Sequence, residues 1–546
     1  MEKRAPLNFR TNELEKKDFL IIDDFGDMRS MIKSMLQAIG ITKLDAAANG
    51  MDAVSAMEAK RYDIVLCDYN LGPGKNGQQV LEEARHRNLI GLGSIFVMIT
   101  AENTLDMVMG AVEYEPDSYL TKPFTKDLLR ARLDKLVEKK KNLKDVEQAV
   151  DRNDFEVAVI LLDKKMAGKP KNLRELIKLK AELCFLAGDY QQAATILEGI
   201  IAEREMTWAL LGLGKVYYAR GDYQKARTLF EKLLLENERF TAAYDWLART
   251  LQMLDQPEDA QEVLHRAVTL SPNAILRQQA LGELALKNQD EETASKALAQ
   301  AVKLGRHSVY KHPSVNASLA KIKARAGASR EGLKILKNMM GEFSGSHEAS
   351  LYASMAECVI HSDAGEADAA EASLQRSREL YEQIGLEAGP NAALEMVRVC
   401  DKLGDSDTAK SLLNTVVKNN HSEDRLLKDV GSLMSELGME PDPESYIEEI
   451  HKEVVNINNH GVELAKSGNL KQALDHFEEA TQGMPANKVV NLNAARVLIM
   501  NMKESGTDRG QLGKVKQYLD KVRKVDDKDP GLRRVHAMYR QLSLGS

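Results

Sequence analysis

An apolar run that ends on an acid constrains the fold of the first quarter of the chain more than any other feature. It covers residues 62–70, reads YDIVLCDYN, and places Asp68 near its end. Continuous β-rich runs of this kind are typical of parallel strands that helices cover on both faces. Because ligands of open α/β sheets lie just beyond the carboxyl ends of such strands, the run predicts a buried strand that delivers Asp68 to a site. An acid in this place can also cap a helix or begin a turn.

Further strands and helices alternate around this run. The predicted strands cover residues 18–24, 44–48, 62–70, 94–100 and 117–120. Helical patterns are predicted over residues 28–36, 52–60, 77–87, 104–112 and 125–136. Such an alternation predicts a doubly wound parallel sheet with right-handed crossovers.

The strand ends that meet at one edge of this sheet carry a distinctive polar set. Its members are Asp23, Asp24, Asp68, Thr100 and Lys122. Three carboxylates in one crevice repel one another and require a divalent cation, and an oxygen-rich, partly hydrated site suits Mg²⁺. With its charge screened, Asp68 can act as a nucleophile toward a phosphoryl group, whose oxygens Lys122 and Thr100 would contact.

This set resembles the receiver domain of two-component response regulators. The residues that carry the resemblance are Asp23-Asp24, Asp68, Thr100-Ala101 and Lys122-Pro123-Phe124. The run DDFGDMR, residues 23–29, is similar to the chemotaxis receivers in particular. The resemblance implies a flavodoxin-like α/β domain with a five-stranded parallel sheet over residues 17–139, after an N-terminal extension of residues 1–16.

The resemblance also implies a phosphoacceptor and its metal ligands. Asp68 would accept the phosphoryl group. Asp24, Asp68 and the backbone carbonyl of Asn70 would bind Mg²⁺ directly, and Asp23 would bind it through water. The alternative is a degenerate receiver that keeps these acids only as loop residues.

A second group of residues would sense and contact the phosphoryl group. Thr100 and Tyr119 would form a switch pair, and Ala101 would lie beside Thr100. Lys122 would pair with the phosphoaspartate, and Pro123 would position the loop, after a peptide bond that can be cis.

Two segments depart from the receiver pattern. The loop over residues 70–77 is rich in glycine and one residue longer than usual, which puts its mobility in question. Residues 113–117, EYEPD, replace the usual small residues before the fifth strand, at a surface that commonly carries the signal outward in receivers.

Beyond the receiver the chain repeats at a period of roughly 34 residues. The clearest pair is LAGDYQQA, residues 186–193, against ARGDYQKA, residues 219–226. The pattern resembles the tetratricopeptide repeat, and the best matches are Leu210, Leu213, Gly214, Tyr217, Gly221, Tyr223, Ala226 and Phe230. This implies an all-α superhelical solenoid over residues 140–546, irregular around 340–400 and 425–455. We predict that Trp208 and Trp246 belong to its core.

The joint between the two parts contains no Pro, Gly or Ser linker. The helical pattern that starts at residue 125 continues to residue 142, which predicts one stiff helix across the joint. The lysines at 139, 140, 141 and 144 are flanked by acids, and we interpret them as a solvated helix face.

Charge and cysteine usage narrow the function classes. The formal net charge is -7, and acids alternate with bases, which argues against a nucleic-acid partner. The four cysteines form no CxxC pair and predict buried, reduced thiols, and no signal peptide or membrane span is expected. These features predict a cytoplasmic protein.

The sequence therefore predicts a response regulator whose output is protein binding. A histidine kinase or phosphotransfer protein would phosphorylate Asp68, and the solenoid would bind an unknown protein target, with homodimerisation or access to the groove as the readout. The protein would be a signalling adaptor and not an enzyme beyond its own phosphorylation and dephosphorylation. One alternative is an inhibitor or phosphate sink for a cognate kinase, and a nucleic-acid-binding regulator is a weaker one.

Overall fold

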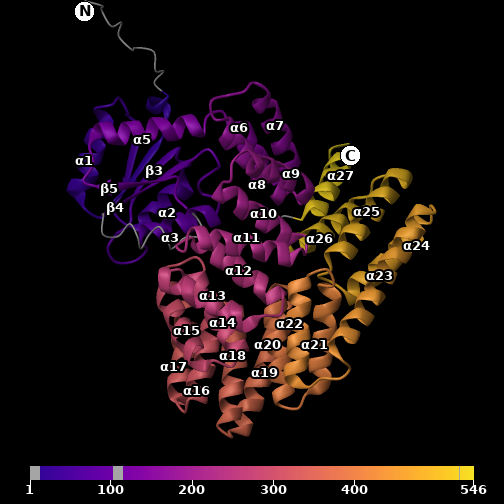
Figure 1. Ribbon diagram of the computed structural model, residues 1–546. Helices are drawn as coiled ribbons and strands as arrows, with labels where there is room; N and C mark the ends of the chain where they lie inside the picture. Colours follow the sequence, from indigo (N-terminus) through magenta and orange to yellow (C-terminus); the bar gives the residue numbers. More distant parts are fainter. Residues whose placement is uncertain (1–12, 102–114, 528, 546) are drawn as a thin grey trace, which may run out of the picture. The chain divides into compact units, whose positions relative to one another are not determined.

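The computed structural model describes residues 13–101, 115–527 and 529–545 (Figure 1). Contacts within the chain divide it into two compact units, residues 1–311 and 312–546. The helix predicted over residues 104–112 and most of the N-terminal extension lie outside the described residues.

The first unit begins with a five-stranded parallel sheet, as the alternating pattern predicts. Its strands are β1 Phe19–Ile22, β2 Leu44–Ala47, β3 Ile64–Asp68, β4 Ile95–Ala101 and β5 Ser118–Lys122. They lie in the order β2-β1-β3-β4-β5, with every pair parallel. The strand order reverses at β1 and β3, so the edge beyond these two strands is the place where open α/β sheets bind ligands.

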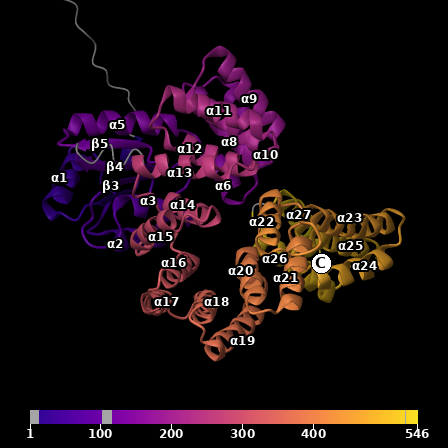
Figure 2. The same cartoon turned by 60° about the horizontal axis from the view of Figure 1, so that its bottom comes forward.

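Helices cover both faces of the sheet (Figures 1 and 2). They are α1 Gly26–Gln37 and α5 Lys126–Lys139 on one face, and α2 Gly50–Ala59 and α3 Gly77–His86 on the other. Alternate residues of each strand point to opposite faces. Phe19 and Ile21 accordingly pack with α1 and α5, whereas Leu20 and Ile22 pack with α2 and α3.

The joint after the receiver is a short turn, so the uninterrupted helix predicted over residues 125–142 is wrong. Helix α5 ends at Lys139, Asn142 adopts a left-handed backbone with φ 61°, and α6 Lys144–Asp151 follows. Lys140 forms an ion pair with Asp117 at 2.6 Å and donates a hydrogen bond to the Ser94 carbonyl. Burial lowers the pKa of Lys140, although Asp117 opposes this effect. The lysine run is therefore not a uniformly solvated face, because one of its members fastens the turn to the sheet.

Helical hairpins make up the rest of the first unit. The helices are α7 Phe155–Ala167, α8 Leu173–Leu186, α9 Tyr190–Glu203, α10 Thr207–Ala219, α11 Tyr223–Glu236, α12 Thr241–Met253, α13 Pro257–Leu270, α14 Ile275–Lys287 and α15 Glu291–Gly305. The first helices of three successive hairpins begin at residues 173, 207 and 241, which are 34 residues apart. This spacing matches the period predicted from the sequence.

The second unit consists of helices alone in the part of the chain that the structure describes. They are α16 Pro313–Arg325, α17 Ser329–Glu342, α18 His347–Asp363, α19 Ala367–Ile384, η3 Gly385–Ala388, α20 Gly389–Lys402, α21 Ser406–Asn419, α22 Asp424–Leu437, α23 Pro443–Lys466, α24 Leu470–Gly483, α25 Lys488–Ser505, α26 Arg509–Val525 and α27 Pro530–Gly545. Some helices are longer where the sequence matches the repeat poorly: α18 has 17 residues, α19 has 18 and α23 has 24.

Close helix contacts explain the small residues of the repeat. A Cβ atom on Gly214 would lie 2.5 Å from the ring of Phe230, and one on Gly461 would lie 2.5 Å from the ring of Phe477. Both glycines precede their partner by sixteen residues. The repeat thus uses glycine at this position so that the two helices of a hairpin can approach closely around a buried aromatic ring.

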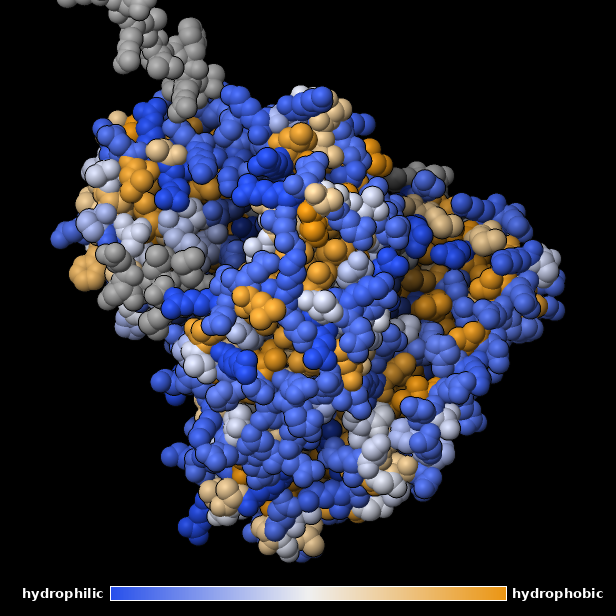
Figure 3. All heavy atoms as spheres, viewed as in Figure 1, coloured by the Kyte–Doolittle hydropathy of each residue, from blue (hydrophilic) through white to orange (hydrophobic). Residues whose placement is uncertain are grey.

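The cysteines and the hydrophobicity of the helices bear on two further predictions from the sequence. All four cysteines are buried and free, as predicted. Among the described residues, no helix combines the length and apolar character needed to cross a membrane. The face seen in Figure 3 is mostly hydrophilic, with hydrophobic side chains showing in smaller groups.

Candidate functional site

Three aspartates lie together at the carboxyl edge of the sheet. Asp23 and Asp24 directly follow β1, and Asp68 is the last residue of β3. Ile22 pairs with Cys67 in the parallel ladder, so the residues after them lie at the same edge. One carboxylate oxygen from each aspartate lies within 4.8 Å of the others. Asp23 and Asp68 are buried and Asp24 is exposed, so the cluster is open to solvent on one side.

Lys122 joins two of these carboxylates. Its Nζ atom lies 3.0 Å from Oδ2 of Asp23 and 3.0 Å from Oδ2 of Asp68. Burial pushes the pKa of Lys122 down, but the two carboxylates outweigh burial and raise this pKa. Burial raises the pKa of Asp68, and the charge of Lys122 opposes that rise. Lys122 therefore remains a cation that holds the two buried acids together.

Backbone groups fix the other oxygen of each buried acid. The Tyr69 N–H donates to Oδ1 of Asp68 at 3.0 Å, and the Phe25 N–H donates to Oδ1 of Asp23 at 2.9 Å. Each carboxylate thus has one oxygen on a backbone amide and one on Lys122. This arrangement sets the orientation of both side chains before any ligand arrives.

Gly77 is a positioning residue that the sequence analysis did not single out. A Cβ atom at this position would lie 2.2 Å from the carbonyl oxygen of Asp68, and the Gly77 N–H donates to the Tyr69 carbonyl at 2.8 Å. The start of α3 therefore packs directly on the end of β3. The signal in the sequence is a glycine at the end of the unusual loop, but the contact itself is not visible there.

The two residues predicted to form the switch pair, Thr100 and Tyr119, lie on β4 and β5. Thr100 and Ala101 end β4, and they pair with Thr121 and Lys122 of β5. Thr100 is fully buried. Tyr119 is half-buried, and burial, followed by the charge of Glu115, raises the pKa of its hydroxyl.

The last two candidates lie in loops beside the acids. Asn70 is exposed two residues after Asp68, and Pro123 follows Lys122 through a cis peptide bond. The oxygen-rich donor set of Asp23, Asp24 and Asp68 fits the ligands that Mg²⁺ prefers. Asn70 adds a backbone carbonyl close to Asp68 in the sequence.

Family models match both parts of the chain. Residues 19–134 match the response regulator receiver domain, and residues 185–250 match the tetratricopeptide repeat. The chain is 31% identical over 120 residues to the chemotaxis protein CheY of Pseudomonas aeruginosa, a match that covers 22% of this chain and 95% of the relative. It is 32% identical over 126 residues to chemotaxis protein CheY-3 of Vibrio cholerae, covering 22% of this chain and 91% of the relative.

Solved structures resemble each part separately. A response regulator protein from Thermotoga maritima in complex with Mg²⁺-BeF is 27% identical, with 22% of this chain and 98% of that chain covered and a TM-score of 0.20. A tetratricopeptide repeat-containing protein from Cytophaga hutchinsonii is 12% identical, with 46% and 98% covered and a TM-score of 0.32. The curated relatives and the two family models are decisive: the chain belongs to the response regulators, with a CheY-like receiver domain at its N-terminus and a tetratricopeptide-repeat region after it.

Proposed function

We propose that this protein accepts a phosphoryl group on Asp68 from a histidine kinase or phosphotransfer protein and binds a protein partner in a phosphorylation-dependent way. The observation that carries the proposal is the placement of Asp68. It is a buried strand-end carboxylate that shares Lys122 with Asp23, and Asp24 lies within 4.8 Å. The protein would act as a cytoplasmic signalling adaptor.

The chemistry is a transfer between two nucleophiles. A carboxylate oxygen of Asp68 forms a bond to phosphorus, the bond between phosphorus and the donor histidine nitrogen breaks, and that nitrogen recovers its lone pair. Bound Mg²⁺ would supply positive charge to the phosphoryl oxygens. Lys122 would keep one hydrogen bond to Asp23 and turn its remaining charge to the new phosphoryl group.

The chain offers a metal-binding set and a switch pair around this acceptor. Asp24 and Asp68 would bind the ion directly with the Asn70 carbonyl, and Asp23 would bind it through water. Thr100 would donate to a phosphoryl oxygen, with Ala101 beside it, and the motion of Thr100 would bias the position of Tyr119.

Contacts within the first unit support a link from Asp68 to the repeats. The loop after Asp68 leads to Lys75, whose Nζ atom donates to the His307 carbonyl at 2.8 Å. Further along α3, Gln79 Nε2 donates to the Leu304 carbonyl at 3.2 Å. Because Gly77 packs on Asp68 itself, a displacement at the phosphorylation site would be passed to these contacts through the short segment from Asp68 to Gln79.

The test is phosphoryl incorporation by the full-length protein. We expect one phosphoryl adduct by intact mass after incubation with Mg²⁺ and acetyl phosphate, and a change in hydrodynamic size by light scattering. Asp68→Asn should remove both effects. Asp127→Asn, an exposed residue in the first turn of α5, is the matched control and should behave as wild type. An adduct that persists in Asp68→Asn would overturn the assignment.

A further inference from the structure

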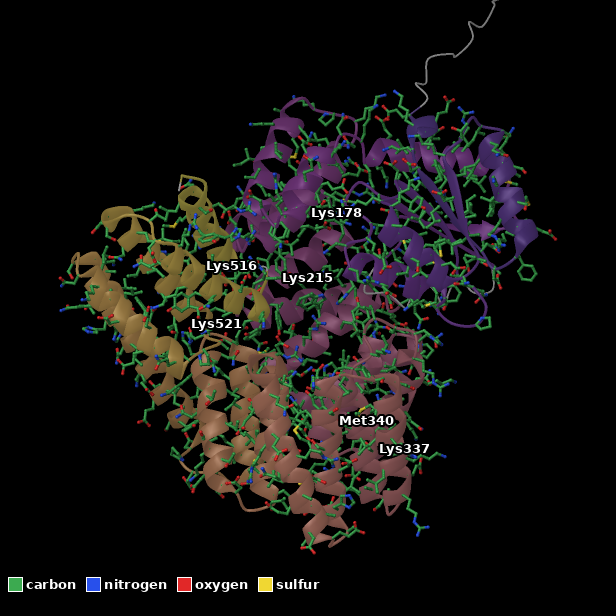
Figure 4. All side chains as sticks on the ribbon, turned by 180° about the vertical axis from the view of Figure 1, so that it is seen from behind. Lys178, Lys215, Lys337, Met340, Lys516 and Lys521 are labelled. Carbon is green, nitrogen blue, oxygen red and sulfur yellow. The ribbon has the colours of Figure 1, made fainter. Side chains whose placement is uncertain are left out.

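Tryptophans and cations that lie over their rings gather on the first helices of successive hairpins in the first unit. Lys178 of α8 lies over Trp208 of α10, with Nζ 5.8 Å from the ring centroid. Lys215 of α10 lies over Trp246 of α12 at 5.3 Å. Arg249, one turn further along α12, has its guanidinium carbon 5.0 Å from the same Trp246 ring. Figure 4 shows Lys178 and Lys215 on these neighbouring helices from behind. We call these five residues the cation–tryptophan patch.

Both tryptophans pack against the hydrophobic core, as predicted from the sequence. Both are nevertheless half-buried and not fully enclosed. Trp246 is held in place by Phe230, which stacks with it at 6.4 Å and 28°, and by the edge of Tyr218 at 5.4 Å. The ring therefore forms a rigid platform for the cations above it.

The cations of the patch have few acidic partners. Within the part of the chain that the structure describes, neither Lys215 nor Arg249 forms a salt bridge. Lys178 has only an exposed contact of 3.8 Å to Glu182 on its own helix, and such contacts contribute little stability. Cation–π contact holds these long side chains in place without neutralising their charge. The surface thus presents pre-organised positive charge to a ligand.

The electrostatics of Lys215 point to an anionic group. Burial lowers the pKa of Lys215, and the charges of Arg249 and Lys178 lower it further. Glu182 and the receiver residue Glu115 are the carboxylates that raise this pKa. An added carboxylate would relieve the repulsion among the three cations, and part of the desolvation that binding requires is already present.

The same contacts favour a peptide over a nucleic acid. Phe230 packs along the Trp246 ring and two cations lie over it, so a base could stack there only by displacing one of them. Carboxylate side chains can pair with these cations while the cations stay over the ring.

We propose that the cation–tryptophan patch is the docking surface for an acidic segment of the partner protein, with side-chain carboxylates received by Lys215, Arg249 and Lys178. This inference rests on the proposed function only in taking the repeats as the partner-binding part. It adds the chemistry of the partner and the residues that receive it.

Intrinsic fluorescence tests the inference directly, because Trp208 and Trp246 are the two tryptophans of the sequence. Full-length protein would be titrated with hexaglutamate, hexaglutamine and a six-nucleotide oligothymidylate. We expect hexaglutamate to change the tryptophan emission saturably and hexaglutamine to have no effect. A stronger response to the oligonucleotide than to hexaglutamate would overturn the peptide assignment.

Substitutions in the cation–tryptophan patch test whether its cations bind hexaglutamate. The double variant Lys215→Gln/Arg249→Gln should weaken hexaglutamate binding by about tenfold or more, which corresponds to a loss of about 1.4 kcal/mol of binding free energy. Lys225→Gln is the matched control, because Lys225 also lies over an aromatic ring, Tyr217 at 5.4 Å, but on the second helix α11. It should bind hexaglutamate as wild type does. Unchanged affinity in the double variant, with a wild-type circular dichroism spectrum, would overturn the proposal.

Phosphorylation is measured in parallel so that the two proposals fail separately. The double variant should still take up a phosphoryl group, and Asp68→Asn should still bind hexaglutamate in the unphosphorylated state. If the wild-type protein is phosphorylated but does not bind hexaglutamate, only the patch is contradicted. If the wild-type protein binds hexaglutamate but takes up no phosphoryl group, only the role of Asp68 is contradicted.

Discussion

The receiver site and the repeat region arrange charge in opposite ways. In the receiver, Lys122 lies 3.0 Å from both Asp23 and Asp68 at the strand ends, so its charge is paired within the site. In the repeats, Lys215 and Arg249 recur 34 residues apart, lie over tryptophan and form no salt bridge with any residue that the structure describes. In the receiver, the charge of Lys122 remains paired until a metal ion or a phosphoryl group replaces one of its partners. The repeats leave their charge available to another molecule.

Glycine substitutions should affect the receiver site and the repeats to very different extents. Gly77→Ala places a Cβ atom 2.2 Å from the backbone oxygen of Asp68, so either β3 or α3 must shift. Because backbone has few ways to yield, we expect a loss of about 3 kcal/mol in the free energy of unfolding, together with loss of phosphoryl uptake. Urea unfolding and intact mass measure the two effects.

The repeat region supplies the control for this prediction. Gly221 has φ 78° and nothing within 4 Å of the added Cβ, so Gly221→Ala costs only the strain of a left-handed backbone, about 1 kcal/mol. Phosphoryl uptake should be unchanged in this variant. Equal losses of stability in the two variants would show that the contact between Gly77 and Asp68 is not a tight one.

Removal of a half-buried lysine distinguishes a metal site from a structural ion pair. Lys122→Met leaves Asp23 and Asp68 without their cation, and we expect a loss of about 2 kcal/mol in unfolding free energy. Mg²⁺ should restore most of this stability, because its ligands are the same acids. The measurement is the urea midpoint with and without Mg²⁺.

Lys321→Met is the matched variant in the second unit. Lys321 forms an ion pair with Glu395. Burial raises the pKa of Glu395, but the nearby cations, Lys321 first, outweigh burial and lower this pKa. We expect a similar loss of about 2 kcal/mol, but no recovery with Mg²⁺. Rescue of both variants by Mg²⁺, or of neither, would remove the distinction between a metal site and an ordinary buried pair.

Local pattern and topology explain what the sequence could predict. Strands β1, β3 and β4 are apolar runs, FLII, IVLCD and IFVMITA, that are recognisable one at a time. Strands β2 and β5, LDAA and SYLTK, are less apolar and are recognisable only from the alternation with helices. The parallel arrangement then brings the residues after β1, β3 and β5 to one edge, which is why Asp23, Asp68 and Lys122 could be grouped. The repeats are equally local, since Gly214 and Phe230 lie within one hairpin.

Contacts between distant segments explain what the sequence could not predict. Lys140 belongs to a charged run, but it forms an ion pair with Asp117, which directly precedes β5, and this contact holds the turn against the sheet. Trp246 fits a core position by its type, yet its cation Lys215 comes from the preceding hairpin. Neither residue carries a sign of its partner in its own neighbourhood, so composition and period predict that Trp246 packs in the core but not which charges contact it.

The half-buried His421 of the second unit makes a weaker, pH-dependent contribution to stability. Burial, and then the nearby His451, lower the pKa of His421 from its usual value of 6.5. Nδ1 of His421 lies 3.0 Å from the side-chain amide of Asn487, which donates to it only while that nitrogen is unprotonated. The unfolded chain therefore binds the proton more readily than the folded chain does. Stability of the second unit should be constant above the usual pKa and fall as the pH drops from 6.5 toward the lowered value.

His421→Gln isolates this effect, because glutamine keeps an acceptor for Asn487 and does not titrate. Urea midpoints of the second unit's transition, measured between about pH 5 and 8, should converge with wild type at low pH and differ most above 6.5. Parallel profiles would mean that His421 is as readily protonated in the folded protein as in the unfolded chain. The histidine therefore tests whether burial without a counter-charge is what makes a charged group costly in this protein.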